Sequence, residues 1–186
     1  MKLFKLTVFV AACLIGVLHT GADAQSNKVR IGVYDSRAIA VAYGASDLRN
    51  TQGDVLDQDI KKAQEERAKA KTTHGAAREK ELKAKLLDLR QRRAQQAFGF
   101  APVDDIIEVI KDRLPEIQRQ TKVETFVSKW DEKELSKYKS AELVDVTLPL
   151  VAEFNPSKKT LQSVWAVQQE KPISAGKIKT AVKKGF

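Results

Sequence analysis

The feature that most limits how this chain can fold is a long charged stretch, residues 54–97. It contains no proline, one glycine and few β-branched residues, and Lys, Arg, Glu, Gln and Ala make up most of it. These residues lose little conformational freedom in a helix. Large apolar residues are too few to bury such helices against an ordinary core. We therefore predict a helical arm or a coiled coil rather than the wall of a compact pocket.

The stretch contains one candidate turn, the segment TTHG that ends at Gly75. Threonine is unfavourable within a helix, and glycine suits the position just after a helix ends. We favour an antiparallel hairpin with its tip here over one uninterrupted helix. The second limb carries a leucine stripe, whereas the first limb offers mainly alanine, so the seam between them is expected to be thin. The stripe consists of Leu82, Leu86, Leu89 and Ala97.

The first 24 residues have the organisation of a secretory signal peptide. Lys2 and Lys5 precede an apolar run, 6–18, and small residues around Ala24 suit signal peptidase. The run is too short for a comfortable membrane span. The segment VAAC ending at Cys13 loosely resembles a lipoprotein signal, but apolar residues continue beyond it, so we favour cleavage after Ala24.

The number of cysteines and the net charge indicate where the protein acts and what kind of partner it attracts. Cys13 is the only cysteine, so the exported chain would have no disulfide, which favours a bacterial periplasm. The whole chain has 33 basic and 24 acidic residues and a net charge of +9. A basic exported chain attracts anionic partners such as membrane surfaces.

Residues that would support catalysis are scarce. His74 is the only histidine beyond the signal segment, and no cysteine accompanies it. Phosphate-binding loops, nucleophile elbows and metal-ligand spacings are missing from the sequence. The acidic pairs Asp57/Asp59 and Glu65/Glu66 lie among lysines and indicate a solvated helix face. We expect no enzyme, no cofactor and no metal site.

Three short segments outside the arm are predicted strands. Residues 28–35 (KVRIGVYD) alternate apolar and polar residues, and 122–129 (KVETFVSK) and 142–147 (ELVDVT) are rich in β-branched residues. Asp35 and Thr147 are placed to cap the helices that follow the first and third strands.

Helices are predicted at 36–45, 103–120, 148–154 and 158–169. The second of these has the clearest amphipathic stripe, and Pro115 should kink it or split it near Leu114. Lysines without acids follow Pro172, so the tail is expected to be partly disordered. The predicted organisation is a signal peptide (1–24), a β-body (25–46 and 98–156), a helical arm (47–97) and a C-terminal helix with a basic tail (157–186).

The order of these elements resembles the Skp/OmpH family of periplasmic chaperones. KVRIGVYD precedes a long charged helical excursion, and VDDIIEVIKDRL returns the chain to KVETFVSK and then to VDVTLPLVAEFNP. The resemblance covers about residues 28–156. It implies an α+β fold: a small β-body, assembled from three subunits, with a long protruding helical hairpin, or tentacle, on each subunit.

The resemblance implies an exported, ATP-independent holdase that binds unfolded outer-membrane proteins. The expected client-contacting residues are Leu56, Ile60, Leu82, Leu86 and Leu89; the alternative is that the same leucines only join the two limbs. The expected residues of the β-body core and of the contacts between subunits are Val29, Ile31, Val33, Val123, Val127, Val144 and Val146. The basic surface consists of Arg90, Arg92, Arg93, Lys177, Lys179, Lys183 and Lys184.

Two other classes remain open at the sequence level. A basic coiled-coil adaptor that links envelope components is the main alternative, because the segment after Pro156 goes beyond the family pattern. Polyanion binding through the basic residues is a third reading, but export argues against nucleic acid as the partner.

Overall fold

The structure is a computed structural model that describes residues 28–73 and 75–185, so the predicted signal peptide and His74 lie outside the described residues. It combines helices with a small sheet, as the coarse fold class predicts. The elements in order are β1 (Arg30–Tyr34), α1 (Ser36–Gly44), α2 (Asp47–Thr51), α3 (Val55–Thr73), α4 (Gly75–Phe98), α5 (Asp104–Val109), η1 (Lys111–Arg113), α6 (Leu114–Thr121), β2 (Thr125–Ser128), α7 (Glu132–Leu135), η2 (Ser136–Tyr138), β3 (Glu142–Asp145), α8 (Thr147–Ala152), α9 (Lys158–Gln169) and α10 (Ala175–Lys183).

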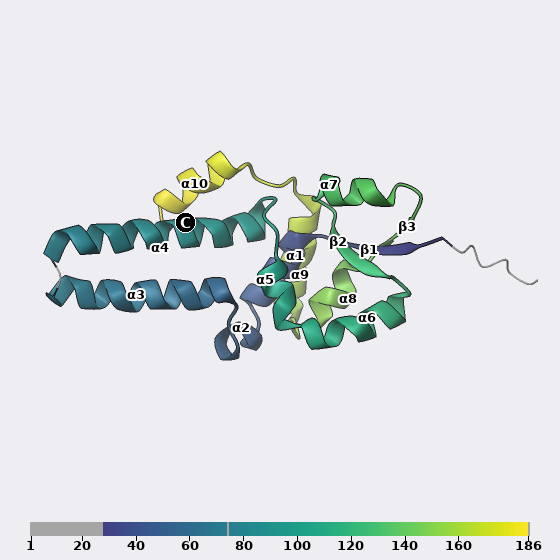
Figure 1. Ribbon diagram of the computed structural model, residues 1–186, viewed down its shortest axis with the longest axis horizontal. Coiled ribbons are helices and arrows are strands. Elements are labelled where there is room, and N and C mark those ends of the chain that lie inside the picture. The colour runs from purple at the N-terminus through teal and green to yellow at the C-terminus, as the bar shows by residue number, and fades with distance from the viewer. Residues whose placement is uncertain (1–27, 74, 186) are drawn as a thin grey trace, which may run out of the picture.

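The molecule has two visibly different parts. The sheet and the short helices gather at one end, and α3 and α4 lie side by side and extend away from them (Figure 1). Helix α10 lies along α4 on the side away from α3 (Figure 1).

The sheet is parallel, with the strand order β2-β1-β3. In its central strand, Ile31 lies opposite Thr125 of β2 and Leu143 of β3. Parallel neighbours need a long crossover connection. Helices α1 to α6 supply the crossover from β1 to β2, so the hairpin is an extension of that connection.

One sheet face and five helices enclose the main core. The core includes buried residues of β1, α1, α5, α6, α8 and α9, together with Phe154 between α8 and α9: Tyr34, Ile39, Tyr43, Ile106, Ile117, Leu150 and Val164. Gly32 allows this packing, because a Cβ at that position would lie 2.9 Å from Phe126 Cδ1 and 2.9 Å from Val146 Cγ2. In α1, Ala38 and Ala42 are fully buried, and their small side chains also allow close packing of the core.

Several local predictions are confirmed. Asp35 caps α1, since its side chain accepts from the backbone N–H of Arg37. The chain turns between α3 and α4, and Gly75 there has a φ of +71°. The predicted break near Pro115 is also found: α5 ends at Val109, and Pro115 lies in the first turn of α6.

Three local predictions need correction. The arm begins at Val55 and not at residue 47, because Gly53 (φ +43°) separates it from the short helix α2. Thr147 does not cap α8; it lies inside the helix, and its hydroxyl accepts from the Asp35 N–H at 3.0 Å. The tail expected to be partly disordered contains α10, because packing on α4 compensates for a polar composition.

Candidate functional site

The residues predicted to touch clients lie inside the hairpin seam. Leu56 and Ile60 of α3 face Leu86 and Leu89 of α4 in one cluster with Ala63. Leu82 shares their face of α4 and is buried as well. Alanines at positions 63 and 70 are fully covered, so the two limbs approach closely. In this conformation the leucines join the limbs and offer no accessible apolar surface.

The outer faces of the hairpin are charged. Residues 55–98 contain twelve basic and seven acidic residues. Beyond the root of the hairpin, two ion pairs of the described residues cross between the limbs, Arg67 with Glu79 at 3.4 Å and Arg78 with Glu66 at 3.3 Å. All four side chains are partly exposed, and such pairs contribute little to stability. The seam therefore depends mainly on its thin apolar contact.

The root of the hairpin holds a polar cluster that the sequence did not reveal. Arg93 Nη2 lies 2.5 Å and 2.6 Å from the two carboxylate oxygens of buried Asp54. The Tyr43 hydroxyl accepts from the Asp54 N–H at 2.8 Å and donates to Asp57 Oδ2 at 3.1 Å. Burial, together with the charges of Asp54 and Asp57, raises the pKa of Tyr43 above its ordinary value. The cluster ties the start of α3 to α1 and to the end of α4.

Arg93 was predicted to lie on a basic surface, and this is wrong. Burial opposes its charge, but the hydrogen bond and the charge of Asp54 outweigh that effect and raise the pKa of Arg93. Its Nη1 also donates to Gln96, whose amide in turn donates to Asp105. Arg90 and Arg92 are exposed, as predicted.

A second buried charge cluster lies at the carboxyl ends of the strands, where parallel sheets commonly place functional residues. Asp35 follows β1 and is fully buried. Its Oδ1 accepts from Arg37 and from the Trp130 indole, and its Oδ2 accepts from Arg37 and from Lys129. Arg37 also donates to the Glu170 carbonyl at 2.9 Å, which connects the sheet to the end of α9.

The hydrogen bonds around Asp35 fit a structural role better than a role in proton transfer. Burial by itself would raise the pKa of Asp35, but the hydrogen bonds from Arg37, Lys129 and Trp130 outweigh it and lower the pKa to about 2. Both carboxylate oxygens are occupied by donors, so neither is available to a substrate proton. The cluster fastens three segments that are distant in sequence.

The residues predicted to form the β-body core differ in how far the fold buries them. Ile31, Val123, Val127 and Val146 are buried, and Val33 and Val144 are half-buried. Val29 is 43% exposed and is not a core residue, because it precedes β1 at the open margin of the sheet. Leu143 of the edge strand β3, which the prediction omitted, is 56% exposed.

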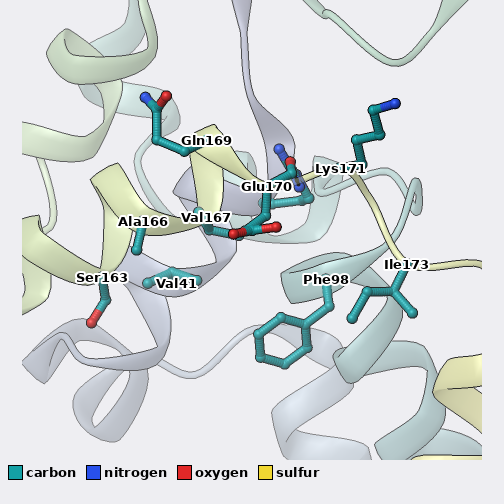
Figure 2. A pocket seen from close by; sticks show the side chains of 10 residues that line it. Val41, Phe98, Ser163, Ala166, Val167, Gln169, Glu170, Lys171 and Ile173 are labelled. Carbon is teal, nitrogen blue, oxygen red and sulfur yellow. Dashed lines mark hydrogen bonds between the residues drawn. The ribbon is translucent and has the colours of Figure 1, made fainter.

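The predicted basic residues of the tail lie on α10. Lys177, Lys179, Lys183 and Lys184 are exposed, whereas Ile178 and Val182 are buried. A cavity of about 680 Å³ lies beside the strap that leads to α10, residues 170–174. Phe98 and Ile173 lie on one side of it, and Val41 and Ala166 lie on the other (Figure 2).

The part of the chain that the structure describes has neither a metal-binding cluster nor a membrane-spanning helix. Residues 28–73 and 75–185 contain no group of side chains that could hold a metal ion. Within the same ranges no helix is long and apolar enough to cross a bilayer. No protein-family model, curated protein or solved structure matches the chain.

Proposed function

We propose that the protein is an exported, ATP-independent holdase that keeps unfolded outer-membrane proteins from aggregating, and that it acts as a homotrimer in the periplasm. The observation that carries the proposal is the pair α3 and α4, which extends from a small parallel sheet. An arm on a small body is the arrangement that the resemblance to the Skp/OmpH family implies.

Open apolar surface on the sheet supports the association of subunits. Leu143 and Val29 lie on the same sheet face as Ile31, because side chains alternate along a strand. Both are substantially exposed. β3 is also an edge strand, whose outer backbone groups are free to pair with another chain. A second copy would cover both the edge and the apolar side chains.

Client holding would be physical and not chemical. The excess of basic residues on the arm provides long-range attraction to anionic segments and to an anionic membrane surface. Each apolar side chain that a client covers contributes on the order of 1 kcal/mol, set by the area buried. Because the predicted contact leucines are inside the seam, they contribute only when the limbs part. Many weak contacts then hold a client without fixing its conformation.

Aggregation of an unfolded β-barrel protein tests this function. The barrel protein is diluted from urea with one client per proposed trimer, and turbidity is followed. We expect suppression by the wild type, and a mass near three chains by light scattering. Full aggregation at that ratio, or a stable monomer, would contradict the proposal.

A matched pair of variants links the two measurements. Leu143→Asp places a charge on the open sheet margin and should give monomers with weaker protection. Leu148→Asp changes another exposed leucine, which lies in α8 and not in the sheet, and should leave mass and protection unchanged. Equal behaviour of both variants would show that the sheet margin is not the interface.

An adaptor of the cell envelope is the second candidate, and one exposed residue favours it. Trp165 on α9 is 62% exposed, and tryptophan is enriched at the centres of binding interfaces. If this function is correct, Trp165→Ala abolishes the capture of a folded envelope protein and leaves turbidity unchanged. A dimer by light scattering would also favour the adaptor.

A further inference from the structure

We propose that the face of α4 opposite the seam is the docking surface for apolar client segments with acidic flanks, and that α10 is a displaceable occupant of that surface. The inference rests on the proposed holdase function and names where clients bind. It also assigns a role to residues 175–183 (α10), which form no part of the sheet or of the α3–α4 hairpin.

The docking surface is a stripe on α4. Leu87, Gln91, Ala94 and Phe98 follow one another at spacings of three or four residues, so they share one face of the helix. At about 100° per residue this face points away from the leucines of the seam. All four residues are half-buried, whereas Lys83 and Arg90 beside them are exposed. Helix α10 packs on this side of α4 (Figure 1).

Two buried apolar side chains anchor α10 on α4. Ile178 and Val182, one turn apart, are 4% and 8% exposed and are its only buried side chains. A Cβ added at Gly99 would lie 3.1 Å from Ile178 Cδ1, so this end of α10 lies against the end of α4. The strap adds one hydrogen bond, from the Ile173 N–H to the Phe98 carbonyl at 2.7 Å. A helix as short as α10 is not stable alone in water, so it forms only while it is docked.

Charge makes α10 a poor partner for α4. The segment after Glu170 has lysines and no acid, and α4 has seven basic and three acidic residues. Among the described residues, none of the ion pairs involves a lysine of α10. Like charges across an interface oppose binding, and opposite charges favour it. An apolar segment with acidic flanks therefore has the advantage over α10.

The strap beside the cavity lets α10 leave without disturbing the core. Phe98 and Ile173 line the cavity between α4 and the strap, and Val41 and Ala166 close its far side (Figure 2). Ile173 is itself 42% exposed, so the strap is only loosely covered. Movement of residues 171–174 breaks one backbone hydrogen bond, from the Ile173 N–H to the Phe98 carbonyl, and leaves the bond from Arg37 to the Glu170 carbonyl intact.

A peptide competition tests the surface in the full exported chain. The probe is a labelled peptide with the sequence of residues 175–184 in which every lysine is replaced by glutamate, and the native lysine peptide is its control. Binding is followed by fluorescence anisotropy, and amide hydrogen exchange is measured in α10. We expect the acidic peptide to bind at least about tenfold more tightly than the lysine peptide and to raise exchange in α10.

Two variants separate docking from folding. The double variant Ile178→Ser/Val182→Ser should free the stripe and strengthen binding of the acidic peptide about tenfold or more, because the apparent affinity scales with the fraction of open protein. The control Lys177→Ser/Lys179→Ser changes as many positions on the exposed side of α10 and should weaken peptide binding, since it removes repulsion that favours undocking. Leu87→Glu, within the stripe, should abolish binding in either background.

The outcomes distinguish this inference from the function on which it rests. The inference is overturned if the acidic peptide leaves exchange in α10 unchanged, or binds the Ile178→Ser/Val182→Ser variant no better than the wild type. It is also overturned if about 1 M salt, which screens the like charges, speeds exchange in α10 and does not slow it. Peptide displacement of α10 without any suppression of client aggregation would remove the holdase function and leave the docking surface standing.

Discussion

Arg93 and Asp54 are 39 residues apart in sequence, yet one guanidinium nitrogen of Arg93 lies within 2.6 Å of both carboxylate oxygens of Asp54. Asp54 immediately precedes α3, and Arg93 lies near the end of α4. The pair therefore closes the hairpin at its root, where both limbs meet the body.

Loss of one partner of this pair should destabilise the protein strongly. Arg93→Ala leaves the buried Asp54 carboxylate without its cation, and breaking such a pair costs about 3–5 kcal/mol. Arg93→Lys keeps the charge and should cost less. Urea unfolding followed by circular dichroism measures both. If Arg93→Ala costs no more than Arg92→Ala, an exposed neighbour, the pair does not close the hairpin.

Asp35 should make stability depend on acid pH. The pKa of its carboxyl is lowered from 3.8 to about 2 in the folded protein, so the folded state favours the charged form. The corresponding stability, about 2 kcal/mol, is fully present above pH 4 and is lost as the pH falls from about 4 to about 2. Urea midpoints measured across this range should fall less in Asp35→Asn than in the wild type.

The exposed carboxyl of Asp112 supplies the control for that titration. Asp112→Asn should keep the wild-type slope between pH 4 and pH 2. If Asp35→Asn and the wild type lose stability in parallel, other carboxyl groups account for the acid sensitivity.

Gly32 should tolerate no larger residue. In Gly32→Ala the new methyl would lie 2.9 Å from Phe126 and from Val146, and overpacking of this kind costs about 1–3 kcal/mol. Gly44→Ala is the matched control, since a Cβ there meets nothing within 4 Å and alanine favours helices. Thermal unfolding should show a lower midpoint only for Gly32→Ala. Equal midpoints would mean that the sheet relaxes around the methyl group.

The seam of the hairpin should depend on its leucines. Leu86→Ala removes a buried side chain from the cluster that it forms with Leu56 and Ala63, and should cost about 2–5 kcal/mol. Val55→Ala changes an exposed apolar residue of the same hairpin and should cost less than about 0.5 kcal/mol. Hydrogen exchange in α3 and α4 should rise only in Leu86→Ala. Unchanged exchange would show that the limbs do not depend on the seam.

Local patterns in the sequence are enough to predict most of the helices and strands. Alternation of apolar residues places β1, glycine and threonine place the turn before Gly75, and Pro115 divides the helix that returns to the body. These features depend on backbone sterics and on side-chain period, which act between near neighbours. The same patterns also indicated that the leucines of α4 share one face.

Tertiary structure decided what those faces touch. Arg93 was predicted to be a surface residue and Thr147 a helix cap, but in the fold they are hydrogen-bonded to Asp54 and Asp35, partners that are distant in sequence. The tail, which composition alone marks as partly disordered, becomes helix α10 because α4 supplies an apolar stripe for Ile178 and Val182. Burial and pairing between distant segments depend on how the whole chain packs, and no local pattern encodes them.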